Sequence, residues 1–188
     1  MPHAPSIFVT AGRSFGKVLR TVKAALHLTD YPRWERNAKE LRTWDARTKV
    51  LGHHILPGSR VLDLGAGAQT LRRHLTGGGL YVPCVLVATS PDTIVVDFNR
   101  GLYPTSERKS VFAVCSGLIE YINEPSVFLK RFQSYASNIL ISYNPSAGGN
   151  RELVIRFGRE WISHFSPEQS EQFFGENNLR FGKGDQWD

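Results

Sequence analysis

The sequence predicts an α/β fold with a doubly wound, mostly parallel sheet, and two observations predict it. From Ser59 onward, apolar runs of strand length alternate with segments of helical spacing, which is the order of a parallel sheet covered by helices. The first run, Val61 to Leu64, stops at a Gly-x-Gly turn and passes directly into a helical segment, as the first strand of such sheets does. We therefore expect an N-terminal helical extension or lid over residues 1–57 and the sheet domain over residues 58–188.

Periodicity and breaker residues place the elements of the sheet domain. Strands are expected near 60–65, 82–87, 93–96, 111–115 and 138–142, with a further strand near 179–183, and helices near 68–76 and 124–136. A last helix is expected to begin after Ser166, because serine caps a helix well and Pro167 suits its first position.

The extension is predicted to hold two helices. In the first, over about residues 15–26, apolar side chains recur at helical spacing with Arg and Lys between them. The second is expected from about Arg33 to Ile55, where Pro57 and Gly58 stop it.

Composition describes an ordinary globular chain. Of the 188 residues, 41% are hydrophobic and 21% are charged, which is enough to bury a core. No apolar run approaches the roughly 18 residues of a membrane-spanning helix, and the first residues lack a secretory signal. Cys84 and Cys115 lie in strand-like apolar surroundings and are expected to be reduced, so a cytoplasmic location is the default expectation.

The net charge of +6 is concentrated in residues 13–49. A basic surface attracts anionic membranes, nucleic acids or acidic substrates, so a weak membrane-surface or other anionic contact through this segment is one interpretation. The other, which we favour, is a solvated helical face that packs on the domain as a lid or buttress. The chain has no aromatic and basic platform of an RNA-binding module, which argues against a nucleic-acid partner.

The run VLDLGAG, residues 61–67, is the first motif that indicates chemistry. Glycine lacks a Cβ, so the chain can turn sharply and a ligand can approach the main chain, and the following helix offers unpaired N–H groups. A dinucleotide fingerprint needs a third glycine at position 70, where this chain has Thr70. An NAD-binding oxidoreductase is therefore a disfavoured alternative, and a purely structural turn is another.

Two further motifs follow in the same order as in a known family. The third strand ends in Asp97-Phe98-Asn99, and the fourth is followed by SGLIEYINEP, residues 116–125. Together with VLDLGAG, over roughly residues 45–145, they resemble the class I S-adenosylmethionine (SAM)-dependent methyltransferases, which have a Rossmann-like sheet. The resemblance implies SAM as the cofactor and a small-molecule or sugar-like acceptor.

The resemblance also implies which residues hold the cofactor. They are Asp63, Gly65, Ala66 and Gly67 at the methionine end, Asp97 and Phe98 at the adenine, and Ser116, Gly117 and Leu118 on the near face of the cofactor. On the sequence alone, a helix cap or turn residue is an equal interpretation of Asp97.

The chain departs from the family at two places. The second strand lacks the carboxylate that accepts hydrogen bonds from the ribose, since Val85 and Val87 occupy its positions and Asp92 lies beyond Pro91 in an expected turn. Such a bond is worth roughly 1.5–3 kcal/mol, so a catalytically weak methyltransferase-like binding or scaffold protein is the alternative function. The family sheet also closes with a hairpin of two strands, of which this sequence shows one, so the last strand is expected to be absent or the chain truncated.

Methyl transfer needs a general base only when the acceptor must lose a proton. The candidates are His164 and Tyr143, which follow the fifth strand, and Glu120 and Tyr121 are expected to line the same pocket. For His164 we favour the alternative of a structural histidine at a helix entry. We predict no metal site, because His53 and His54 have no cysteine or carboxylate at metal-binding spacing.

Overall fold

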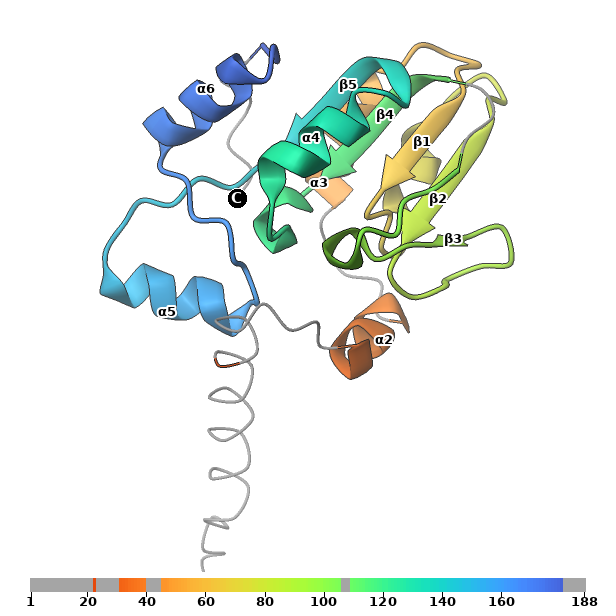
Figure 1. Ribbon diagram of the computed structural model, residues 1–188. Helices are drawn as coiled ribbons and strands as arrows, with labels where there is room; N and C mark the ends of the chain where they lie inside the picture. Colours follow the sequence, from red (N-terminus) through yellow and green to blue (C-terminus); the bar gives the residue numbers. More distant parts are fainter. Residues whose placement is uncertain (1–21, 23–30, 40–44, 106–108, 181–188) are drawn as a thin grey trace, which may run out of the picture.

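A five-stranded parallel sheet in the order β3-β2-β1-β4-β5 forms the centre of the molecule in the computed structural model (Figure 1). The structure describes residue 22 and residues 31–39, 45–105 and 109–180. The strands are β1 (Val61–Leu64), β2 (Tyr81–Val85), β3 (Ile94–Val95), β4 (Ser110–Ser116) and β5 (Ala136–Ser142), and every neighbouring pair is parallel. The chain runs outward from β1 to β3 and then returns to place β4 beside β1. The predicted doubly wound sheet is confirmed.

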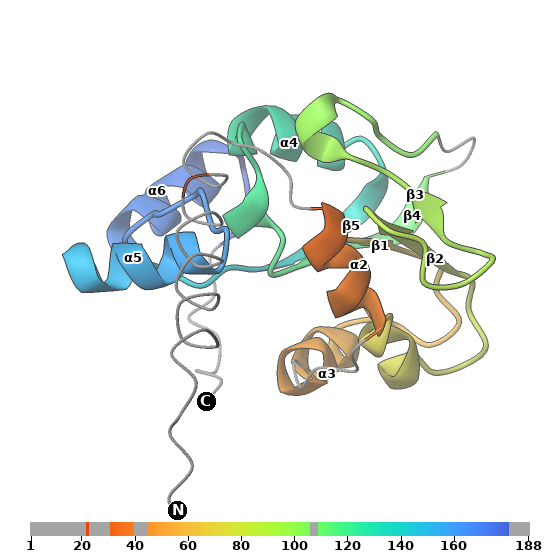
Figure 2. The same ribbon diagram turned by 90° about the horizontal axis from the view of Figure 1, so that it is seen from below.

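Helices cover both faces of this sheet. The helices of the described residues are α2 (Tyr31–Lys39), α3 (Asp45–His53), α4 (Pro125–Phe132), α5 (Asn150–Gly158) and α6 (Pro167–Glu176), with the 3₁₀ helices η1 (Thr70–His74), η2 (Phe98–Arg100) and η3 (Ile119–Tyr121). Figure 2 shows α3 on one side of the sheet and α4 on the other, while α5 and α6 lie beyond β5. No helix of the described residues is long and apolar enough to cross a membrane.

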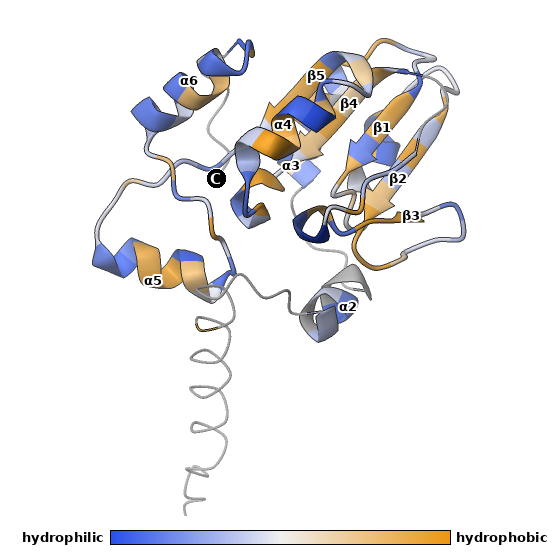
Figure 3. Cartoon of the chain, viewed as in Figure 1, coloured by the Kyte–Doolittle hydropathy of each residue, from blue (hydrophilic) through white to orange (hydrophobic). Residues whose placement is uncertain are grey.

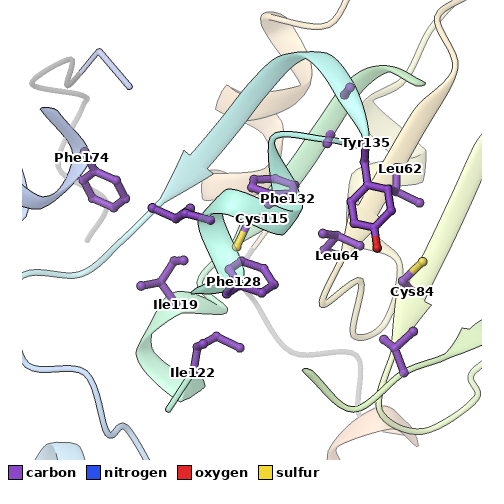
Figure 4. Packing of buried hydrophobic residues seen from close by; sticks show 14 residues of the cluster. Leu62, Leu64, Cys84, Cys115, Ile119, Ile122, Phe128, Phe132, Tyr135 and Phe174 are labelled. Atoms are coloured by element: carbon purple, nitrogen blue, oxygen red, sulfur yellow. The ribbon is translucent and has the colours of Figure 1, made fainter. Parts of the chain in front are cut away.

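The two faces bury separate cores because successive strand residues point to opposite sides. Leu62 and Leu64 of β1 pack with Phe128 and Phe132 of α4 (Figure 4). On the other face, Val61 packs in a second cluster with residues of α3, η1, β2 and β4. The central strands are apolar along almost their whole length, as strands covered on both faces are (Figure 3). Asp63 lies between Leu62 and Leu64 and therefore faces the second cluster.

Three local expectations need correction. The helix expected from Arg33 to Ile55 is two helices, α2 and α3, separated by residues 40–44, which lie outside the described residues. The segment expected as a helix at 68–76 is the shorter η1, because Gln69 at φ 55° interrupts a helical start before Thr70. Helix α5 was not expected, because its apolar residues follow one another and leave Val154 and Ile155 exposed.

The last helix begins as predicted. In α6 the Ser166 side chain accepts a hydrogen bond from the Gln169 N–H at 3.2 Å, and the Gln169 side chain accepts one from the Ser166 N–H at 2.8 Å. Leu179 and Arg180 are not in a strand, and the rest of the strand expected at 179–183 lies outside the described residues. So does the basic helix expected at 15–26, apart from the helical Val22.

Candidate cofactor and acceptor site

The carboxyl ends of β1 and β4 are adjacent at the point where the chain direction across the sheet reverses. Ligands of doubly wound sheets bind outside such a switch point. The turn after β1 is fixed against β2, because the N–H groups of Gly65 and Ala66 both donate to the Cys84 carbonyl, at 2.8 and 3.1 Å. The glycines at 65 and 67 have φ of 80° and 50°, a region that favours glycine.

The loops after β1 and β4 touch each other. A Cβ built on Gly65 would lie 3.2 Å from the Leu118 side chain, and one built on Gly117, at φ 62°, would lie 2.2 Å from a guanidinium nitrogen of Arg47. The structure therefore brings together the predicted residues of both loops. It adds Arg47 of α3, which the sequence analysis missed because nothing local in α3 points to a site 70 residues further along the chain.

Buried charges lie beneath these loops. The Asp63 carboxylate accepts a hydrogen bond from the Tyr81 hydroxyl at 2.6 Å, and burial raises the pKa of Asp63 to about 6 although Tyr81 and Arg47 oppose the rise. Arg47 donates to the Ser116 carbonyl at 3.2 Å, and its charge also acts on Glu120. An acid and a guanidinium therefore lie at the methionine end predicted from the resemblance.

The residues after β3 separate into two environments. The Asp97 carboxylate is buried and accepts a hydrogen bond from the Tyr31 hydroxyl of α2, and it makes no capping bond to η2. The Phe98 ring packs against Phe128 and Tyr103, with ring centroids 5.1 and 5.4 Å apart. Helix α2 thus reaches the acid expected to accept from adenine, whereas Phe98 contributes to the core beside it.

The end of β2 is neutral at a position where the resemblance predicts a carboxylate. Val85 is buried at the last position of β2. Asp92 lies in the turn before β3, as expected, where it pairs with Arg72. In the loop that follows β2, the hydroxyls of Thr89 and Ser90 contact the Gln69 amide.

Arg156 of α5 organises the segment that follows β5. Its guanidinium is 2% exposed and stacks 4.7 Å from the Trp161 ring. It donates to the Asn144 carbonyl at 3.0 Å, the Ser163 carbonyl at 3.1 Å, the Tyr143 hydroxyl at 3.3 Å and Nδ1 of His164 at 3.1 Å. The two predicted catalytic side chains thus meet on one buried cation that the sequence analysis did not identify.

These contacts define what each predicted catalytic side chain offers. The Nε–H of Arg156 can only donate, so Nδ1 of His164 is an acceptor and the neutral ring carries its proton on Nε2. Burial and the Arg156 charge lower the pKa of His164, and burial raises that of Tyr143 to about 12. The Tyr143 hydroxyl also donates to the Ser163 carbonyl at 3.0 Å and accepts from the Phe165 N–H at 2.8 Å. Both side chains therefore favour hydrogen bonding over proton abstraction.

Glu120 joins the two halves of the site. It follows the Ser116–Leu118 segment, is 1% exposed, and accepts a hydrogen bond from the Asn144 N–H at 3.0 Å. Its carbonyl accepts from the N–H groups of Ile162 and Ser163. Burial raises the pKa of Glu120, and the charges of Arg47 and Arg156 oppose this rise. Among the described residues, no group of three His, Cys, Asp or Glu could hold a metal ion.

No family model and no curated protein matches this chain. Among solved structures, a putative methyltransferase of Haloferax volcanii, in complex with the Trm112 methyltransferase activator, is 13% identical, with a TM-score of 0.52 over 84% of this chain and 75% of that one. The chain has a class I methyltransferase-like fold.

Two further solved structures match with lower scores. The pyocyanin biosynthetic protein PhzM is 11% identical over 70% of this chain, with a TM-score of 0.47, and the chain spans about half of its length, 48%. A Thermotoga maritima SAM-dependent methyltransferase, possibly a histamine N-methyltransferase, is 14% identical over 79% of this chain and 75% of that one, with a TM-score of 0.44.

Proposed function

We propose that the chain binds SAM and transfers its methyl group to a small-molecule or sugar-like acceptor. The observation that carries the proposal is the junction of the glycine turn after β1 with Leu118 in the loop after β4, at the switch point of a methyltransferase-like fold. Asp63 and Arg47 flank this junction with opposite charges. Cys84 and Cys115 are free and buried, which suits a reducing compartment such as the cytoplasm.

The side chains at this edge fit the polar groups of SAM. The Asp63 carboxylate would accept from the α-ammonium group and Arg47 would pair with the α-carboxylate, while the glycines leave the main chain open to the ligand. Asp97 would accept from the adenine amine in exchange for the Tyr31 hydroxyl. When bound, SAM supplies an electrophilic methyl group on its sulfonium.

The residues after β5 would orient the acceptor. Alignment of a nucleophile with the methyl group provides much of the acceleration in such a transfer. The Nε2–H of His164, which is buried and has no hydrogen-bond partner in the described part of the chain, would donate to an acceptor oxygen. Tyr143 and Arg156 would act as positioning residues, because they hold the ring and the loop around it.

Calorimetric titration with SAM and S-adenosylhomocysteine tests the proposal. We expect micromolar binding that Asp63→Ala abolishes and that Glu171→Ala, an exposed acid on α6, leaves unchanged. Transfer from isotopically labelled SAM to a panel of small acceptors would then identify the substrate.

The alternative function is a methyltransferase-like scaffold, which Val85 at the carboxylate position favours. It predicts that the folded protein binds neither compound. That result would overturn the enzyme assignment and leave the fold as the conclusion.

A further inference from the structure

A cluster of uncharged polar side chains links the loop after β1 to the loop after β2. Nε2 of Gln69 lies 2.9 Å from Oγ1 of Thr89, 2.5 Å from Oγ of Ser90 and 3.3 Å from Oγ1 of Thr93. Gln69 has a left-handed φ of 55° and is 9% exposed, so its side chain is held in one place by the fold. Rigid placement of this kind is what a binding group needs.

This cluster follows the carboxyl ends of β1 and β2, the edge at which the resemblance predicts a carboxylate for the cofactor ribose. The turn after β1 bonds to the Cys84 carbonyl, and Val85 is the next residue. The Gln69 N–H donates to the Ala66 carbonyl at 2.7 Å, so Gln69 continues directly from the glycine turn. Thr89 and Ser90 follow the end of β2 on the way to β3.

The chemistry of the amide matches a pair of vicinal hydroxyl groups. A carboxylate can only accept hydrogen bonds, whereas a ribose diol also accepts them, and an amide with neighbouring hydroxyls both donates and accepts. In the described part of the chain, no group donates to Oε1 of Gln69. Oε1 of Gln69 is therefore available to accept a hydrogen bond from a ligand, although the residue is nine-tenths buried.

We infer that Gln69, with the hydroxyls of Thr89 and Ser90, forms an uncharged ribose subsite that replaces the missing carboxylate of β2. Oε1 of Gln69 accepts a hydrogen bond from one ribose hydroxyl, and the Thr89 and Ser90 hydroxyls complete the contact. The inference rests on the proposed function, since it requires a cofactor with a free ribose diol.

Calorimetric titration of the full chain tests the inference with two ligands, S-adenosylhomocysteine and its 2′,3′-dideoxy analogue. We expect Gln69→Ala to weaken binding of S-adenosylhomocysteine about tenfold and to leave binding of the dideoxy analogue unchanged. Gln69→Glu keeps an acceptor at this position, to which the Thr89 and Thr93 hydroxyls can donate while Ser90 keeps its bond to Asp92, and it should bind S-adenosylhomocysteine at least as tightly as the unmodified chain. Gln172→Ala, an exposed glutamine on α6, is the matched control.

The outcomes separate this inference from the function on which it rests. Equal binding of S-adenosylhomocysteine by Gln69→Ala and the unmodified chain overturns the subsite, as does an equal loss for both ligands, which would make Gln69 a structural clamp. If Gln69→Ala fails to fold, Gln69→Glu decides: a loss of S-adenosylhomocysteine binding there overturns the inference. Failure of the unmodified chain to bind either ligand overturns the proposed function, and the subsite falls with it.

Discussion

The methionine end and the ribose end of the candidate cofactor site differ in charge. At the methionine end, the partly buried Arg47 interacts electrostatically with the buried acids Asp63 and Glu120. At the ribose end, Val85 and the Gln69 cluster carry no charge themselves, and the carboxylate that the Ser90 hydroxyl contacts, Asp92, is exposed and paired with Arg72. Buried charges are costly unless they are paired, whereas an amide with hydroxyl partners is not. Affinity at the methionine end should therefore depend on pH and on the placement of the charged groups, whereas affinity at the ribose end should depend mainly on hydrogen bonds.

The largest effect should come from Gly117→Ala, which disturbs the charged end. The new Cβ requires a left-handed φ from alanine and displaces Arg47, so we expect a loss of roughly 3 kcal/mol in unfolding free energy and loss of S-adenosylhomocysteine binding. Chemical denaturation and calorimetry measure the two effects. Gly148→Ala is the matched control, because Gly148 has φ 87° but nothing within 4 Å of its Cβ position. If the two variants lost equal stability and both still bound S-adenosylhomocysteine, the position of Arg47 would not depend on the absence of a side chain at Gly117.

The charged end should also respond to pH, in two opposite directions. The pKa of Asp63 is raised from 3.8 to about 6, so between these values the folded protein binds more protons than the unfolded chain. The Asp63 contribution to stability is therefore fully present below pH 4 and is lost as pH rises towards 6, by up to about 3 kcal/mol. Affinity for the ammonium group of S-adenosylhomocysteine should instead rise over the same range, because only ionised Asp63 attracts it.

Denaturation and calorimetric titrations between pH 4 and 7 measure both trends. The pKa of Glu120 is also raised, so Glu120 contributes to the same pH dependence. The Asp63 contribution is therefore obtained by comparing the unmodified chain with Asp63→Asn. This variant should flatten, in part, both the stability curve and the affinity curve. Parallel trends in stability and affinity would contradict a proton held by Asp63 in the free protein.

The two ends also differ in how far the sequence predicted them. The strand, glycine turn and acid of VLDLGAG lie within seven residues, so local rules were sufficient to propose Asp63, Gly65 and Gly67 as site residues. The absence of a carboxylate at position 85 could also be recognised from the local sequence. Arg47, Tyr31 and Gln69 matter through contacts with residues 69, 66 and 20 positions away, which periodicity and motif spacing do not encode.

The residues after β5 show the same difference between what local sequence predicts and what long-range contacts determine. His164 and Tyr143 could be proposed from their place after the fifth strand. Their partner Arg156 lies on α5, a helix whose consecutive apolar residues give no helical pattern. The tautomer of His164 follows from that partner and changes the role expected of the ring. Sequence predicted which residues gather there, and the network determined their chemistry.

A carboxylate introduced at the end of β2 tests whether the ribose end lacks a charged acceptor. We expect Val85→Asp to raise affinity for S-adenosylhomocysteine about tenfold, since it supplies the acceptor that β2 lacks, and to lower stability because position 85 is buried. Val87→Asp tests the other position at which the carboxylate was expected, and Val127→Asp, at an exposed position of α4, is the control and should leave affinity unchanged. Calorimetry and thermal unfolding measure the two effects. A gain at position 87 instead of 85 would shift the ribose subsite along the loop.

The smallest effect should come from Tyr31→Phe, which removes the hydroxyl that donates to Asp97. In the free protein, Asp97, the acid expected to accept from the adenine amine, already accepts from the Tyr31 hydroxyl. Cofactor binding must therefore replace the Tyr31 hydroxyl by the adenine amine as the donor. The bond is part-buried, with Asp97 buried and Tyr31 exposed to solvent, so we expect a small change: affinity for S-adenosylhomocysteine should rise about twofold to threefold, with an increase in the association rate. Tyr103→Phe, another tyrosine near η2, should change neither quantity. A fall in affinity for Tyr31→Phe would instead show that α2 contributes to the bound state, and that the adenine end requires both Asp97 and the tyrosine above it.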